Sequence, residues 1–274
     1  MKIFILNQII FLLLIVTFIS CKKDSITNPE RTKIYYLSKI YENTSLVTEY
    51  IYDDNDNVIR KNIYSEDGSL LRYYEYTYNT EGQLGRIDNY SLANDSTFIH
   101  SWTNFVYDTN NNIIRAQNYL DFYLHAYYVN YVYYQYNNSI CNQVIYIDAD
   151  YFGYPVDTTS IIEYSYDNSN HLTEIIEYYY PSYRIDDIYQ FEYDNKNYYG
   201  LHLSFNDEFQ NKWYKQKNNI TKRIRYNRDM TESWTTEYQY VYNQDNFPVS
   251  RTKISYSNDQ TSEQTDMHYE YIIK

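Results

Sequence analysis

The stretch YSYDNSNHLTEIIEY, residues 164–178, contains a phrase that recurs along most of this chain. An alternating run ends at Tyr166, Asp167 follows, Asn170 stands three positions further, and a new apolar run begins. Aspartate side chains accept hydrogen bonds from the backbone two residues on and so start turns, and asparagine tolerates a positive φ. A type I turn followed by one left-handed residue closes a hairpin of this length. The stretch therefore predicts a strand, a tight turn and a second strand.

The tyrosine before the turn, here called the anchor tyrosine, recurs at a nearly constant interval. It stands at Tyr52, Tyr78, Tyr107, Tyr136, Tyr166, Tyr193 and Tyr242, each time followed by Asp or Asn. The intervals run from 26 to 30 residues, apart from a last gap of 49 that predicts one degenerate copy within it. Recurrence at a fixed period indicates a repeated supersecondary unit.

Residues that accept a left-handed backbone occupy one fixed position in the six regular copies. They are Asp56, Gly82, Asn111, Asn170, Asn197 and Asn246. The segment YSEDGSL, residues 64–70, fits the same template with Gly68 in that position and predicts another hairpin between the first two anchors.

The runs between turns alternate with period two. In residues 72–78, Tyr74, Tyr76 and Tyr78 share one face, and Glu75 and Thr77 share the other. This is the pattern of a strand with two different faces, and no stretch after Cys21 keeps a helical period.

The fold class that follows is all-β, an antiparallel β-meander of roughly sixteen strands. Because strands twist, a meander of that length has to coil, stack or close, so we expect a curled sheet or a barrel-like form. No Pro- or Gly-rich linker divides the chain after about residue 33, and residues 34–274 are expected to form a single domain.

The first residues give an address. A lysine, a short apolar run and a small residue before Cys21 are typical of a secretory signal, and FISC, residues 18–21, resembles a lipobox. We therefore expect a lipoprotein signal peptide over residues 1–20, lipidation of Cys21, a polar tether over residues 21–33, and location as an outer-membrane lipoprotein facing the periplasm or the cell surface. An ordinary signal peptide with a chance cysteine stays an alternative.

Composition excludes some classes of partner and function. The net charge of −13 disfavours nucleic acid, because phosphate repels an acidic surface. The expected mature chain has one further cysteine, Cys141, so it has no disulfide framework, and Cys141 is expected to be a buried small residue rather than a reactive thiol. The 41 tyrosines favour strands, where a large amphipathic ring fits a half-covered surface.

No constellation for catalysis or cofactor binding is present in the sequence. It has no phosphate loop, nucleophile elbow, dinucleotide fingerprint or zinc spacing, and its five histidines are scattered. We therefore expect no cofactor, no metal and no enzymatic activity. The pair Asp186-Asp187 could hold a cation, although a solvated loop is the simpler interpretation.

A basic segment, residues 212–228, holds no acidic residue. Its candidate contacts for an anion or glycan are Lys212, Trp213, Tyr214, Lys215, Lys217, Lys222, Arg223, Arg225 and Arg228. If the segment forms two adjacent strands, the cations could line one strip that contacts acidic glycan, lipopolysaccharide phosphate or another protein. The alternative is a strip that balances acidic neighbours across the sheet. The aromatic segment from Ala126 to Tyr136 leaves a similar choice between a sugar-stacking platform and core lining.

Two resemblances rest on these motifs. YDNSNHL and YNTEGQL resemble the YD repeats of Rhs-type cell-surface proteins. YDNKNYYGL from Tyr193, KNNITKRIRY from Lys217 and YNQDNFPVSRTKISY from Tyr242 resemble a family of lipid-anchored bacterial proteins of unknown function with a porin-like β fold. The resemblance implies a large antiparallel barrel or strongly curled sheet, and it brings no catalytic residue.

The leading hypothesis is a non-enzymatic, lipid-anchored envelope protein that binds a glycan or another envelope component, or has a structural role. An integral outer-membrane β-barrel and a hydrolase of envelope polymers stay open as alternatives.

Overall fold

The computed structural model describes most of the chain after its first segment. It describes residues 33–93, 96–122, 126–138, 140–150, 154–198, 200, 218–257 and 260–274. The chain divides into two units, residues 1–34 with Lys274 and residues 35–273, and all the strands belong to the second. The expected signal peptide, Cys21 and almost all of the tether lie outside the described residues.

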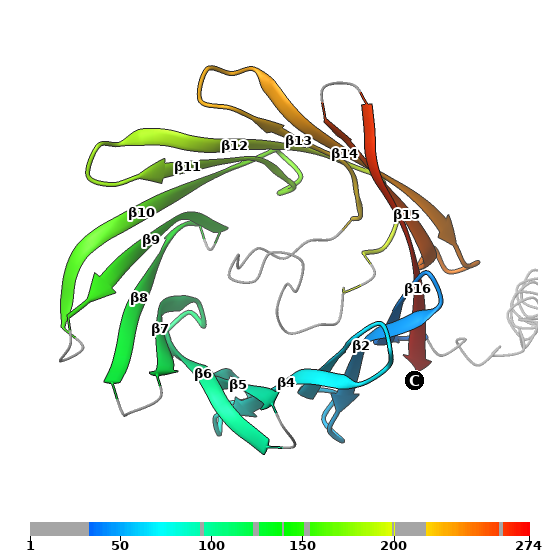
Figure 1. Ribbon diagram of the computed structural model, residues 1–274, viewed down its shortest axis with the longest axis horizontal. Coiled ribbons are helices and arrows are strands. Elements are labelled where there is room, and N and C mark those ends of the chain that lie inside the picture. Colours follow the sequence, from blue (N-terminus) through cyan, green and yellow to red (C-terminus); the bar gives the residue numbers. More distant parts are fainter. Residues whose placement is uncertain are drawn as a thin grey trace, which may run out of the picture. The chain divides into compact units, whose positions relative to one another are not determined.

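Sixteen antiparallel strands form one closed barrel in the described part of the chain (Figure 1). Each strand pairs with its neighbour in sequence, and β1 pairs with β16 to close the ring. The strands are β1 Tyr35–Glu42, β2 Ser45–Tyr52, β3 Val58–Tyr64, β4 Leu70–Tyr78, β5 Leu84–Ala93, β6 Ser96–Tyr107, β7 Ile113–Phe122, β8 Ala126–Asn137, β9 Ile140–Ala149, β10 Pro155–Tyr166, β11 Leu172–Tyr179, β12 Arg184–Tyr193, β13 Ile220–Tyr226, β14 Glu232–Tyr242, β15 Pro248–Ser257 and β16 Gln260–Ile273. The predicted all-β meander is confirmed, and it closes.

The predicted turn chemistry is confirmed in five of the six regular copies. Asp56, Gly82, Asn111, Asn170 and Asn246 all have φ between 63° and 78°. Gly68 has φ 82°, which confirms the extra hairpin, and Met230 has φ 64°, in a turn after Tyr226 that is the degenerate copy expected in the last gap.

The sixth copy departs from the prediction, because Asn197 is not left-handed and no tight hairpin follows Tyr193. In an ordinary copy the Asp53 carboxylate accepts hydrogen bonds from the backbone of Asn55 and Asn57, both at 2.9 Å. Asp194 accepts the first of these bonds from Lys196, and Asn219 supplies the second at 3.1 Å. The turn is therefore kept at both its ends, and residues 197–218 stand where other copies have one left-handed residue.

A one-residue β-bulge follows every turn of this type. At the Tyr166 turn, Tyr166 pairs with Leu172 while Ser165 pairs with Glu174, so Thr173 is the extra residue. The same shift occurs at the other anchor tyrosines, at Tyr64 and at Tyr226. Bulges strengthen the local twist, which a closed sheet requires.

The abundance of tyrosine is explained in part by a set of hydroxyl bonds, here called the tyrosine ladder. A tyrosine at or near the end of each of seven even-numbered strands donates its hydroxyl to the carbonyl of an early residue of the preceding strand. The pairs are Tyr52–Leu37, Tyr78–Val58, Tyr107–Leu84, Tyr136–Ile113, Tyr166–Cys141, Tyr240–Ile220 and Tyr271–Pro248, at 2.5–2.9 Å. Each bond clips the open end of a hairpin, opposite its turn.

The repeat period places all seven anchor tyrosines at one end of the barrel. About 28 residues make two strands and two turns, so the chain returns to the same end with every copy. We call this the anchor end and the opposite one the far end; the far end holds the turns after Tyr64 and Tyr226.

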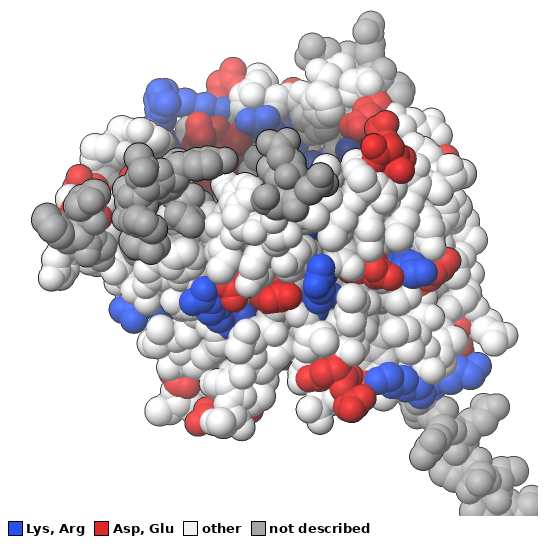
Figure 2. Space-filling view, turned by 60° about the horizontal axis from the view of Figure 1, so that its bottom comes forward, with Lys and Arg blue, Asp and Glu red and all other residues white. Residues whose placement is uncertain are grey.

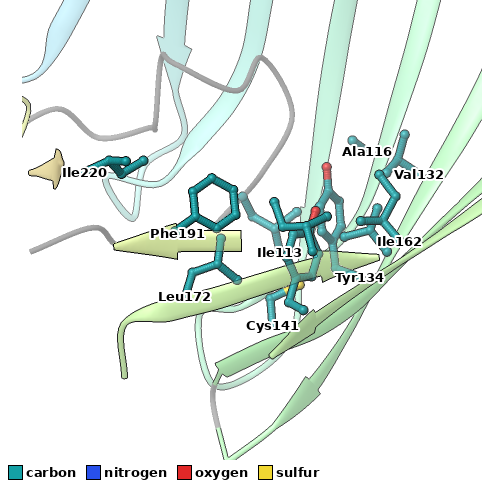
Figure 3. Close-up of a cluster of buried hydrophobic side chains, with 12 residues drawn as sticks. Ile113, Ala116, Val132, Tyr134, Cys141, Ile162, Leu172, Phe191 and Ile220 are labelled. Atoms are coloured by element: carbon teal, nitrogen blue, oxygen red, sulfur yellow. The ribbon is translucent and has the colours of Figure 1, made fainter. Parts of the chain in front are cut away.

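The inner face of the barrel is identified by Tyr198, which follows β12. Its side chain is 3% exposed and packs in a cluster with Tyr50 of β2, Tyr76 of β4 and Tyr269 of β16. These strands lie across the ring from β12, so only the inner face can bring them together. Near the anchor end this face carries a belt of buried residues, the first or an early residue of alternate strands, part of which is seen in Figure 3.

The outer face carries charged residues around most of the ring, here called the outer girdle. They include Lys39, Glu49, Arg60, Glu75, Arg86, Asp88, Arg115, Glu163, Glu174, Lys222, Glu237 and Glu270. Figure 2 shows red and blue side chains in a row across the middle of this wall. Opposite charges meet across strands, for example Arg60 with Glu75 at 3.8 Å and Lys39 with Glu270 at 3.9 Å.

Replacing Met230 by Asn should stabilise the barrel by about 0.5–1 kcal/mol. Met230 is 56% exposed, so little burial is lost, while a left-handed backbone is strained for a side chain of this kind and suits Asn. Urea unfolding of the variant measures the gain. The reverse change at the equivalent position, Asn170→Met, is the matched control and should destabilise by a similar amount.

Cys141 should resist thiol reagents in the folded protein. It lies 4% exposed in the inner belt, and burial raises the pKa of its thiol to about 12. The reactive thiolate is therefore scarce at pH 8. Alkylation of a Cys21→Ser variant should be slow until denaturant is added, and fast labelling of the native protein would contradict the inner position.

Candidate functional site

The described part of the basic segment lies on both faces of one strand. Because β13 alternates, Lys222 points outward, Arg223 and Arg225 point into the barrel, and Arg228 stands in the turn after Tyr226. Lys212, Trp213, Tyr214, Lys215 and Lys217 lie outside the described residues. The expectation that the segment forms two adjacent strands with one cationic strip is wrong for its described part, since a single strand cannot present consecutive residues on one face.

Arg223 and Arg225 instead join residues of four other strands in a hollow of about 440 Å³, here called the lumenal pocket. All its side chains belong to the inner face of five consecutive strands, β11 to β15. The pocket is lined by Ile175, Tyr189, Arg223, Arg225, Trp234, Lys253 and Ser255. It combines three cations, two aromatic rings and a hydroxyl.

A buried carboxylate holds Arg225 in position. Arg225 Nε donates to Asp187 Oδ1 at 2.6 Å and Nη2 to Oδ2 at 3.0 Å, a two-point pairing across β12 and β13. The hydrogen bond to Asp187 raises the pKa of Arg225. Tyr189 also donates to Asp187, at 3.0 Å, and burial, with the Asp187 charge as a smaller cause, raises the pKa of Tyr189 to about 12. Asp187 therefore binds a cation, as the sequence allowed, but the cation is a side chain.

The other side of the lumenal pocket is also held by polar contacts. Trp234 Nε1 donates to the Thr236 hydroxyl at 3.2 Å, which orients the indole. Lys253 Nζ donates to Glu263 of β16 at 3.0 Å, and this bond lowers the pKa of Glu263. Positions fixed in this way lose less entropy when a ligand binds.

The inner face at the pocket is accessible to water. The Arg225 side chain is 48% exposed and that of Glu263 is 53% exposed, although both point into the barrel. The lumenal pocket can therefore exchange a polar ligand with solvent.

Outside the barrel, Lys222 has acidic neighbours in register on both sides. It lies opposite Glu192 of β12 and Glu237 of β14. For this residue the arrangement agrees with the interpretation of cations that balance acidic neighbours across the sheet.

The aromatic segment from Ala126 to Tyr136 is divided between the two faces of β8. Tyr131 and Tyr133 lie on the outer face with Tyr119, and Tyr134 and Tyr136 lie in the inner cluster. Both earlier interpretations therefore described one face of the same strand.

Sequence reasoning missed Tyr189, Trp234 and Lys253 as members of the site. Each is an inward residue of an alternating strand, so its face could be read from the sequence. Their proximity depends on strand register, which no local motif contains.

Among the residues that the structure describes, no three His, Cys, Asp or Glu side chains are grouped to hold a metal ion. In the same residues, no helix is long and apolar enough to cross a bilayer.

No model of a known protein family matches the chain, and neither does any curated protein. Among solved structures it is similar to a porin-like protein from Bacteroides uniformis, with 16% identity, 86% of this chain and 96% of that chain covered, and a TM-score of 0.40. It is also similar to a porin-like protein from Bacteroides vulgatus, with 10% identity, 87% and 99% covered, and a TM-score of 0.40. Identities and TM-scores at this level are too low to assign a function.

Proposed function

We propose that this protein is a non-enzymatic binding protein of the cell envelope whose barrel lies outside the lipid and takes a polar ligand in its lumen. In this proposal Cys21 bears the lipid that tethers it to the outer membrane. The observation that supports it best is the combination of a charged outer girdle with a solvent-accessible cationic and aromatic pocket inside.

The outer girdle argues against immersion in a bilayer. A membrane barrel presents an outward apolar band about 25 Å tall, and Arg or Lys near the middle of that band costs about 2–4 kcal/mol each. Spanning strands need about 9–11 residues, whereas β1, β2, β3, β11 and β13 have only 7 or 8.

An integral barrel remains the second candidate because one part of the outer face is aliphatic. Ile145, Ile161, Ile176 and Ile188 follow each other across β9 to β12 on that face. Such a patch would suit lipid, although residues of the outer girdle flank it on the same strands.

Fractionation of the full chain and of Cys21→Ser distinguishes the two candidates. The wild type should incorporate acyl label and sediment with membranes, while Cys21→Ser should be released by carbonate as a folded soluble protein. A Cys21→Ser protein that stays in the membrane after carbonate would overturn the proposal in favour of the integral barrel. The hydrolase alternative stays a prediction, to be tested on a panel of envelope glycans.

A further inference from the structure

We propose that the lumenal pocket binds an acidic polysaccharide through a pyranose unit that bears a carboxylate or phosphate. This rests on the proposed binding function and names its ligand class. Three features support it: the charge of the pocket, the donors it still offers, and its aromatic walls.

The pocket is positive inside a strongly acidic protein. Its three cations, Arg223, Arg225 and Lys253, face two carboxylates, Asp187 and Glu263, which leaves one net positive charge. The whole chain carries −13. An anionic ligand is therefore repelled by most of the surface and attracted at this place, which gives selectivity through charge.

The paired cations keep donors for a ligand. A guanidinium has five N–H donors, and the bonds of Arg225 to Asp187 use two of them. An ammonium group has three donors, and Lys253 uses one on Glu263. Guanidinium groups match carboxylate and phosphate oxygens in a two-point geometry, which favours these anions over a simple halide.

The neutral part of the ligand would contact Trp234 and Tyr189, which lie on opposite sides of Arg225 in the strand order. The apolar face of a sugar ring suits contact with an aromatic side chain, and the indole is already oriented by its bond to Thr236. Ser255 offers a hydroxyl for a ring substituent. A hollow of about 440 Å³ is in the range of small-molecule sites and holds one or two sugar units rather than a folded partner.

The experiment is calorimetric titration of the folded Cys21→Ser protein with oligogalacturonate, its neutral methyl ester, and a phosphomannan fragment. Oligogalacturonate or the phosphomannan should bind, the methyl ester should not, and affinity should fall with added salt. Arg223→Gln should weaken binding about ten-fold or more, the loss expected for a hydrogen bond to a charged group. Trp234→Ala should weaken it as well.

Lys222→Gln is the matched control, since it removes a cation from the adjacent residue of the same strand but on the outer face; it should change affinity less than about two-fold. Lys253→Gln is a second inner variant that keeps the test valid if Arg223→Gln does not fold, which circular dichroism would reveal. The two acidic probes decide between carboxylate and phosphate.

Several results would overturn the inference. Equal binding of the methyl ester would exclude an anionic ligand class but leave the binding function intact. Acidic binding that Lys222→Gln removes and the inner variants do not would move the site to the outer face. If no probe binds to a folded, soluble protein, the ligand class is wrong, whereas a Cys21→Ser protein that cannot be released from membranes would instead defeat the proposed function.

Discussion

Above about pH 10 the barrel should lose stability steeply and unfold cooperatively. The cause is the tyrosine ladder, whose hydroxyls are bonded to backbone carbonyls on the inner face. Burial raises the pKa of Tyr52, Tyr166 and Tyr271 well above the ordinary value of 10.0, and that of Tyr107 to about 12. An ionised hydroxyl can no longer donate its hydrogen bond, so the folded state holds protons that the unfolded chain releases.

The sign follows from this difference in proton binding. Below pH 10 both states are protonated and the ladder's contribution is complete; between pH 10 and the folded pKa values, stability falls as pH rises. Each well-buried tyrosine contributes about 1.4 kcal/mol per pH unit, so the first three remove about 4 kcal/mol over one unit. The half-buried Tyr107 contributes less because of solvent screening. A loss of this size is comparable with the whole stability of many domains.

Circular dichroism and tyrosinate absorbance, followed together against pH, measure the effect. The two signals should change in one transition, because the ladder tyrosines ionise when the barrel opens. Tyr271→Phe should flatten the pH dependence by one group and also destabilise the barrel at pH 7 by about 1 kcal/mol, since the Pro248 carbonyl loses its partner. Tyr73→Phe, on the outer face, is the control and should leave the transition in place. Ionisation of all tyrosines near pH 10 without unfolding would contradict the ladder.

The architecture could be predicted because the repeat combines two local signals. Alternation gives the strands, and Asp or Asn at a fixed distance from a left-handed residue gives the turns, as at Asp167 and Asn170. The 26–30-residue period then fixes that successive anchors share an end. Closure was not predictable in the same way, because it depends on the pairing of β1 with β16 across more than two hundred residues.

The site was predicted only in part for the same reason. Arg223 and Arg225 were found because they belong to a conspicuous charge run. Lys253 and Trp234 stand alone in ordinary strands, and only the registers of β13 with β14 and of β14 with β15 bring them to the same pocket. The error about a single cationic strip arose from reading residues 212–228 as two strands instead of part of one.

The clearest failure of local reasoning is the copy at Tyr193. Its sequence, YDNKN, has Asp194 and Asn197 in the expected positions, so nothing nearby distinguishes it from a tight turn. The residue that completes the turn is Asn219, whose side chain donates to Asp194 Oδ2 at 3.2 Å and to the Asn197 carbonyl at 2.8 Å. The spacing gave one hint, since Tyr193 and Tyr226 are 33 residues apart, the longest interval between the turns of this type at which two strands are enclosed.

This arrangement makes Asp194 the residue whose loss should cost the most among the turn aspartates. Its carboxylate accepts bonds from the backbone of Lys196 and of Asn219, from the Asn219 side chain and from the Tyr242 hydroxyl. Asn219 is fully buried, so Asp194→Ala would leave donors unpaired away from water. Each such donor costs about 1–3 kcal/mol, and the variant should lose about 3 kcal/mol or more.

Asp167→Ala is the matched control, because Asp167 makes the same two backbone bonds, to Ser169 and His171, in an exposed tight turn. Water can replace those bonds, so the loss there should be much smaller. Urea unfolding of both variants, compared with Asp194→Asn, measures the difference: Asn keeps an acceptor and is the natural residue at this position in three other copies. Equal losses for Asp194→Ala and Asp167→Ala would mean that Asn219 does not close the turn across residues 197–218, because only that closure buries the donors that Asp194 satisfies.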